Sequence, residues 1–106
     1  MKVLLEECVD WRLGRELAGH EIKTARQMGW ATLKNGELLG LAAAHFDVFI
    51  IVDRNLAFQQ NVGALDIAVF VLKARTNRFA DLRRLLPPLL AVLPSARAGQ
   101  VEQIGE

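Results

Sequence analysis

Two uninterrupted apolar runs constrain the fold of this chain more than any other feature. Residues 47–52 read DVFIIV, which is apolar from Val48 onward, and residues 67–72 read IAVFVL. Both runs are rich in β-branched and aromatic side chains. Neither run alternates apolar with polar residues, so each predicts a strand that is buried on both faces. Strands of this kind occur in parallel sheets that helices cover on both sides. The two runs therefore favour an α/β fold.

Weaker signals around these runs alternate between strand and helix. Shorter patterns predict strands at residues 3–5, 21–24 and 100–104, the last of them at a sheet edge. Helical spacing predicts one helix over 10–18 with Asp10 as its N-cap, and a second that Asn35 caps and that ends near His45. Alternation of strands and helices predicts a parallel sheet with helices on both faces.

A last helix is predicted from Asn77 onward, with Pro87 and Pro88 bending or interrupting it because proline lacks the N–H that a helix interior needs. Its apolar side chains recur at the spacing of one buried face. The residues expected to face inward are Phe79, Leu82, Leu85, Leu86, Leu89 and Leu90.

Length and composition indicate one globular domain over residues 1–106. The chain is 52% apolar and 24% charged, and its net charge of +1 neither indicates nor excludes a nucleic-acid partner. Cys8 is the single cysteine, so an internal disulfide and a thiolate metal cage are both excluded, and a cytoplasmic location is expected. The longest uncharged apolar stretch, residues 85–93, is about half of a membrane span, so no membrane association is expected.

Charged residues follow three of the predicted strands. Glu6 and Glu7 come after the first strand, Asp53 follows DVFIIV, and Lys73 and Arg75 follow IAVFVL. Ligands of open α/β sheets bind beyond the carboxyl ends of the strands, so we expect three acids and two bases to converge on that edge.

Clustered carboxylates repel one another and need a compensating cation. Oxygen-only ligands favour Mg²⁺ or Mn²⁺, and such an ion can lower the pKa of a bound water and stabilise charge on a phosphoryl oxygen. The fork of Arg75 could hold a phosphate nearby. Acids after strands are also common as loop residues and helix N-caps, and this alternative stays open.

Other charged and aromatic residues have simpler explanations. Glu37, in the first turn of the helix after Asn35, is a further candidate, although the helix dipole alone favours an acid there. Trp11 and Trp30 are expected to be packing residues. No glycine-rich phosphate loop is present, so a nucleotide cofactor is not expected. Four arginines are expected on solvated helix faces: Arg12, Arg15, Arg83 and Arg84.

Taken in order, four segments resemble the short PIN-like family related to VapC toxins. They read KVLLEE, NGELLGLAA, IIVDRNLAFQQN and VFVLKART, and together they run over nearly the whole chain. The resemblance implies a three-layer α/β sandwich with a central, mostly parallel sheet of four or five strands. It also implies a Mg²⁺- or Mn²⁺-dependent endoribonuclease, a hydrolase that acts on RNA as the toxin of a toxin-antitoxin pair and is held in check by a cognate antitoxin protein.

Residue by residue, the family's leading aspartate falls on Glu6, its following acid on Glu7, and the acid of its third strand on Asp53. The resemblance thus implies a metal site of Glu6, Glu7 and Asp53. It implies catalytic roles for Glu6, Asp53 and Glu37. Substrate binding would fall to Arg75, which matches the family's arginine after the fourth strand, with Lys73 and Arg54 beside these motifs.

Three departures from the family pattern reduce the expected metal affinity. Glu6 is one methylene longer than the aspartate it replaces, and Asn35 and Asn55 are amides where the family has acids. A weakly active or inactive member of the family is therefore one alternative, and a non-catalytic interaction module is another. Such a module would dimerise or bind a partner through the apolar segment 79–93.

A phosphoacceptor receiver domain is a third alternative. Receiver domains also carry an acid pair after the first strand and an aspartate after the third, which would make Asp53 the phosphorylated residue. The lysine expected after the fifth strand is missing, and the tail beyond Gly99 is expected to be too short for the last strand and helix of that domain.

Overall fold

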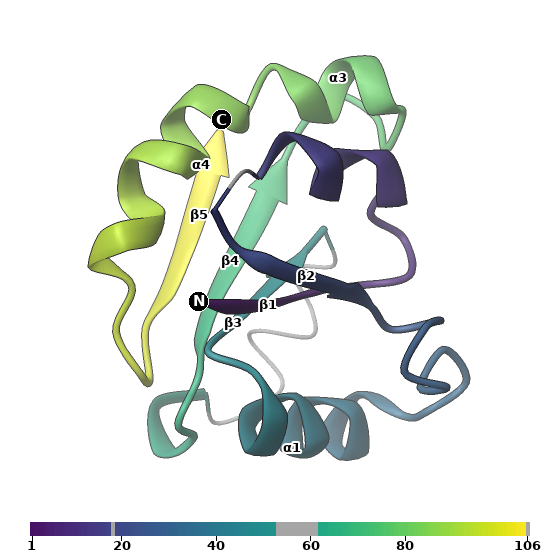
Figure 1. The fold of residues 1–106 in the computed structure, drawn as a ribbon, viewed down its shortest axis with the longest axis vertical. Coiled ribbons are helices and arrows are strands. Elements are labelled where there is room, and N and C mark those ends of the chain that lie inside the picture. Colours follow the sequence, from purple (N-terminus) through teal and green to yellow (C-terminus); the bar gives the residue numbers. More distant parts are fainter. Residues whose placement is uncertain (18, 53–61, 106) are drawn as a thin grey trace.

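A computed structural model describes residues 1–17, 19–52 and 62–105 of the chain. Its centre is one sheet of five strands, all parallel, in the order β2-β1-β3-β4-β5 (Figure 1). The strands are β1 (Lys2–Leu5), β2 (Glu21–Thr24), β3 (Val48–Ile51), β4 (Ala68–Lys73) and β5 (Val101–Gly105). The α/β prediction and all five predicted strands are confirmed.

Helices cover both faces of this sheet, which gives three layers (Figure 1). Helix α1 (Asn35–His45) packs on one face, with the short 3-10 helix η2 (Val62–Ala64). The 3-10 helix η1 (Trp11–Glu16), α3 (Phe79–Arg83), α4 (Leu86–Val92) and the 3-10 helix η3 (Leu93–Ser95) lie on the other. Within the described residues, no helix has the length and apolar character needed to cross a bilayer.

The central strand β3 shows why its sequence does not alternate. Val48 and Ile50 belong to the core under η1, α3 and α4, whereas Phe49 and Ile51 belong to the core under α1. All four side chains are fully buried. Because successive side chains point to opposite faces and both faces are covered, every position must be apolar. Strand β2, at the sheet edge, alternates exposed and half-buried residues instead.

The helix predicted from Asn77 is two helices. Pro87 and Pro88 lie in the first turn of α4, where a missing N–H costs nothing, so the break falls just before them. Leu82, Leu86 and Leu89 are buried as predicted, but Leu90 is 38% exposed, so its inward assignment is wrong. Most apolar side chains of segment 79–93 thus pack on the chain's own sheet.

The beginnings of the first two helices differ from each other. Asp10 caps η1 as predicted, because its side chain accepts a hydrogen bond from the Arg12 backbone N–H at 3.0 Å. The turns of η1 are 3-10 rather than α-helical. Helix α1 begins at Asn35 itself and its N-cap is Lys34, without a side-chain hydrogen bond. The prediction that Asn35 caps this helix is therefore wrong.

The strand order contains a topological switch point between β1 and β3. From β1 the chain moves outward to β2, and from β3 it moves the other way to β4 and β5. Leu5 is in register with Thr24 on one side and Ile50 on the other. Open α/β sheets bind ligands in the crevice outside the carboxyl ends at this point, because the loops diverge there. The residue after β1 is Glu6.

Candidate active site

Glu6 is a buried carboxylate at the switch point. It is 9% exposed and is the one charged side chain that is buried among the described residues. Its Oε1 accepts a hydrogen bond from the Val52 backbone N–H at 3.0 Å, and its own N–H donates to the Ile50 carbonyl oxygen at 3.0 Å. Burying a charge is costly unless hydrogen bonds replace water, so the amide just past β3 both stabilises this carboxylate and orients it.

Asp53, the second predicted acid, directly follows Val52 in the sequence. Asp53 and Arg54 lie outside the described residues. The hydrogen bond from Val52 nevertheless ties Glu6 to the residue immediately before Asp53.

Glu6 lines a hollow of about 520 Å³, here called the acidic hollow. Its other acids each have a cation: Arg26 Nη2 lies 2.6 Å from Glu7 Oε1, and Arg12 Nη2 lies 2.7 Å from Asp10 Oδ2. The hydrogen bond from Arg12 holds the pKa of Asp10 below its usual value. The lining residues are Glu6, Glu7, Val9, Asp10, Trp11, Thr24, Arg26 and Gln27.

The described residues fit part of a Mg²⁺ or Mn²⁺ site. Glu6 and Glu7 offer the carboxylate oxygens that these ions prefer. Arg26 already neutralises Glu7, which weakens it as a ligand. No three His, Cys, Asp or Glu side chains within residues 1–17, 19–52 and 62–105 are placed to hold a metal ion. The predicted ligand set therefore needs Asp53 for its completion.

Glu37 does not join this cluster. It lies in the first turn of α1, where its side chain is exposed, and it is not among the residues that line the acidic hollow. An acid in a first helical turn interacts favourably with the helix dipole, which accounts for Glu37 without a catalytic role.

The predicted bases line a different hollow of about 310 Å³, here called the basic hollow. Lys73 and Arg75 come from the end of β4, and Arg84 joins them from the end of α3. This hollow shares no lining residue with the acidic hollow. Glu6 and Glu7 therefore lie at the same edge of the sheet as the two bases, but in a separate hollow, so these groups do not converge on one place.

Two functional candidates were missed from the sequence. Arg26 stands two residues after β2, and it would have been found had the residues after this weaker strand been considered with the others. Trp11 was expected to pack, yet it is 56% exposed, more than any other large hydrophobic side chain among the described residues. Trp30 does pack, with its ring centroid 5.8 Å from that of His45 and 6.0 Å from that of Phe46.

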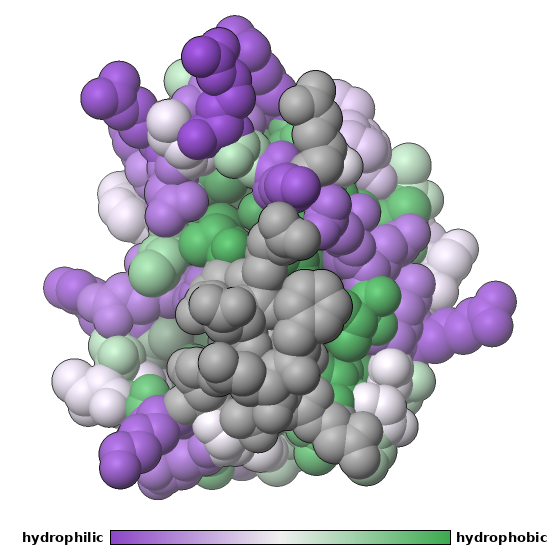
Figure 2. All heavy atoms as spheres, turned by 180° about the vertical axis from the view of Figure 1, so that it is seen from behind, coloured by the Kyte–Doolittle hydropathy of each residue, from purple (hydrophilic) through white to green (hydrophobic). Residues whose placement is uncertain are grey.

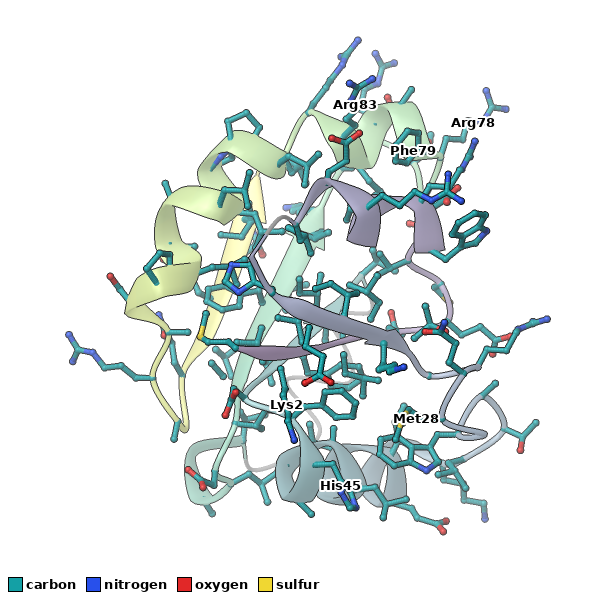
Figure 3. All side chains as sticks on the ribbon, viewed as in Figure 1. Lys2, Met28, His45, Arg78, Phe79 and Arg83 are labelled. Carbon is teal, nitrogen blue, oxygen red and sulfur yellow. The ribbon has the colours of Figure 1, made fainter. Side chains whose placement is uncertain are left out.

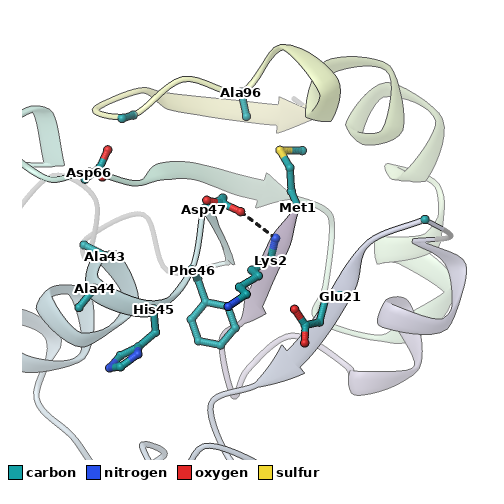
Figure 4. A pocket seen from close by; sticks show the side chains of 12 residues that line it. Met1, Lys2, Glu21, Ala43, Ala44, His45, Phe46, Asp47, Asp66 and Ala96 are labelled. Atoms are coloured by element: carbon teal, nitrogen blue, oxygen red, sulfur yellow. Dashed lines mark hydrogen bonds between the residues drawn. The ribbon is translucent and has the colours of Figure 1, made fainter.

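A larger hollow of about 830 Å³ opens at the opposite edge, among the amino ends of the strands (Figure 4). Its lining includes Glu21, His45, Asp47 and Asp66, all of them exposed. The Lys2 backbone N–H donates a hydrogen bond to Asp47 Oδ2 at 2.9 Å. The Asp47 carboxylate therefore caps the beginning of β1. Because this hollow has no buried charged group and lies at the edge away from the switch point, we assign the functional site to the carboxyl edge.

No protein-family model matches this chain, and neither a curated protein nor a solved structure is similar to it at a significant level.

Proposed function

We propose that this protein is a metal-dependent endoribonuclease of the PIN-like type, with its reaction centre at the acidic hollow. One observation carries the proposal: a buried carboxylate, Glu6, stands at the switch point and is bonded to the residue that precedes Asp53. The resemblance of KVLLEE and IIVDRN to the family's two strand-end acid motifs supports the same pair of residues. By the same resemblance, the protein is the toxin of a toxin-antitoxin pair with a cognate antitoxin protein.

The roles of the residues follow from this arrangement. Glu6 is held in one orientation by the Val52 N–H, so little side-chain freedom is lost when a cation or a phosphate arrives. Asp53, which follows Val52 in the sequence, is the second carboxylate of the proposed site. Glu7, paired with Arg26, keeps the mouth of the hollow close to neutral and so reduces repulsion of an incoming phosphodiester. Mg²⁺ or Mn²⁺, when bound, supplies an activated water and neutralises charge on the phosphoryl oxygens.

Cleavage of labelled RNA tests the proposal. Purified protein is incubated with RNA in Mn²⁺ and, separately, in chelator, alongside the variants Glu6→Gln and Asp53→Asn. Asp66→Asn is the matched control, because Asp66 is an exposed acid at the opposite edge. We expect cleavage by wild type and by the control in Mn²⁺ only, and none by the two site variants. Intact RNA in every lane, or equal cleavage by all variants, would overturn the proposal.

The strand order favours a second candidate, a phosphoacceptor receiver-like domain. The order β2-β1-β3-β4-β5 is the order of receiver domains, which place acids after β1 and an aspartate after β3. The tail beyond Gly99 was expected to be too short for the last strand of a receiver domain, but it forms strand β5. Against this candidate, Gly105 and Glu106 stand where such domains have a lysine. Mass spectrometry after incubation with acetyl phosphate and Mg²⁺ decides: one added phosphoryl group, absent in Asp53→Asn, would favour the receiver.

A further inference from the structure

The cations of this protein are concentrated in two short segments that lie side by side. Residues 10–16 and 73–84 contain seven of the 13 lysines and arginines but only three of the 12 acids, a net charge of +4, whereas the rest of the chain carries −3. Helix α3 packs against η1, with Arg83 Nε 3.8 Å from Glu16 Oε1. Figure 3 shows Arg78, Phe79 and Arg83 at this end of the molecule, and Figure 2 shows hydrophilic side chains crowding it.

Aromatic rings are interleaved with these cations. The guanidinium carbon of Arg12 lies 4.6 Å from the ring centroid of Phe79, and that of Arg15 lies 4.5 Å from the ring centroid of Trp11. Stacking of this kind orders the arginines and presents flat surfaces to solvent. Trp11 is more exposed than any other large hydrophobic side chain among the described residues. This exposure is costly in free energy, because burial of an indole is strongly favourable. We call this combination of η1 and α3 the arginine–aromatic surface.

The acids on this surface are already engaged, and several cations are not. Asp10 is paired with Arg12, and Asp81 accepts a hydrogen bond from the Thr76 hydroxyl. Within the part of the chain that the structure describes, no ion pair is formed by Arg15, Arg75, Arg78 or Arg84. These four guanidinium groups remain available for an external anion.

Trp11 also lines the acidic hollow, so the arginine–aromatic surface continues into the site at the switch point. We propose that this surface binds single-stranded RNA, stacking bases on Trp11 and holding phosphates with the arginines of η1 and α3, and that it delivers the strand to the acidic hollow. Delivery of the RNA to the acidic hollow rests on the proposed function. Binding of the RNA to the surface does not. An exposed aromatic ring among arginines, here that of Trp11, favours a single strand, because unpaired bases can stack on it.

The test measures binding without catalysis. Anisotropy of a short 5′-fluorescein oligouridylate is titrated with wild type in chelator, at several salt concentrations. Reversal of the α3 pair, the two unpaired arginines that flank α3, in Arg78→Glu/Arg84→Glu is expected to raise Kd by at least about tenfold. It is also expected to flatten the salt dependence, because each lost phosphate contact lowers the slope by about 0.7. Lys34→Glu/Arg97→Glu, which reverses two exposed cations elsewhere, is the matched control and is expected to retain the wild-type affinity.

Trp11→Ala separates stacking from charge. We expect it to raise Kd about tenfold and to leave the salt slope unchanged, while Trp11→Phe restores most of the affinity. Circular dichroism verifies that each variant is folded. Equal weakening by the α3 pair and the control pair, an unaffected Trp11→Ala, or no binding at low salt would overturn the proposal. So would equal affinity for polyglutamate, which would identify an acidic protein as the partner.

The two proposals fail in different ways. RNA that binds in chelator but stays intact in Mn²⁺ would contradict the nuclease and leave the binding surface standing. Cleavage in Mn²⁺ with the same kcat/KM for wild type, Trp11→Ala and the α3 double variant would contradict the surface and leave the nuclease standing.

Discussion

The two hollows at the carboxyl edge of the sheet are built in opposite ways. The acidic hollow contains a buried charge, Glu6, which the backbone N–H of Val52 fixes in place. In the basic hollow Arg75 and Arg84 are exposed, and no ion pair within the described residues restrains them. A buried charge must be anchored because water no longer solvates it, whereas an exposed cation needs no anchor. The first arrangement suits chemistry at a fixed point, and the second suits capture of a flexible anion.

The largest effect is expected at the anchored charge. Glu6→Gln keeps an oxygen that can accept from Val52 N–H but removes the charge, so we expect at least about a 100-fold loss of Mn²⁺-dependent RNA cleavage. The free energy of unfolding should change by less than about 1 kcal/mol. Cleavage rates and urea denaturation measure the two quantities. A fully active Glu6→Gln would show that this carboxylate has only a structural role. The difference between the two hollows would then say nothing about catalysis.

The next effect concerns the backbone beneath the basic hollow. Gly105 has a φ of +105°, and a Cβ there would overlap the Lys73 carbonyl oxygen. Gly105→Ala is therefore expected to destabilise the protein by about 2 kcal/mol. Gly40→Ala is the matched control: its Cβ meets nothing within 4 Å on α1, and helix propensity predicts a gain of about 0.5–1 kcal/mol. Thermal unfolding of both variants measures the difference, and equal melting temperatures would contradict the close approach of β5 to β4.

A smaller effect is expected when a capturing cation is reversed. Arg75→Glu should raise KM for RNA by about tenfold and leave kcat unchanged, because an exposed cation that holds phosphate contributes to binding rather than to the chemical step. Steady-state cleavage of RNA by wild type and variant measures both parameters. A lower kcat with an unchanged KM would place Arg75 at the reacting phosphate and would merge the two hollows into one site.

The smallest effect concerns the ion pair at the rim of the acidic hollow. Because Arg12 lowers the pKa of Asp10, the pair stabilises the fold above the unfolded-state pKa of Asp10, and this stabilisation is lost as pH falls through the folded-state pKa. Arg12 is half exposed, so solvent screening keeps this contribution small. Asp10→Asn keeps a capping oxygen and removes the charge. Urea denaturation should show it less stable than wild type at neutral pH. The difference should shrink as pH falls below roughly 4 and vanish below the folded-state pKa of Asp10.

Much of the fold could be predicted because local patterns report how each segment is buried. The runs at 48–52 and 67–72 are apolar throughout, as a strand covered on both faces requires. Pro87 and Pro88 predict a break in the last helix from the sequence alone, because each proline lacks the N–H of a helical hydrogen bond in any tertiary context. The prediction that Trp11 packs is wrong, because local spacing does not show which side of a short helix faces solvent.

The sequence by itself determined the strands, the break in the last helix and the acids that end the first and third strands. The tertiary structure decided which strands are neighbours, and so it alone placed the switch point beside Glu6. It also brought Glu6 to Val52 across 46 residues and Arg26 to Glu7 across 19. Such pairings depend on how the whole core packs, and no local window contains that information. The same packing brought η1 beside α3 and gathered their arginines into one surface next to the acids.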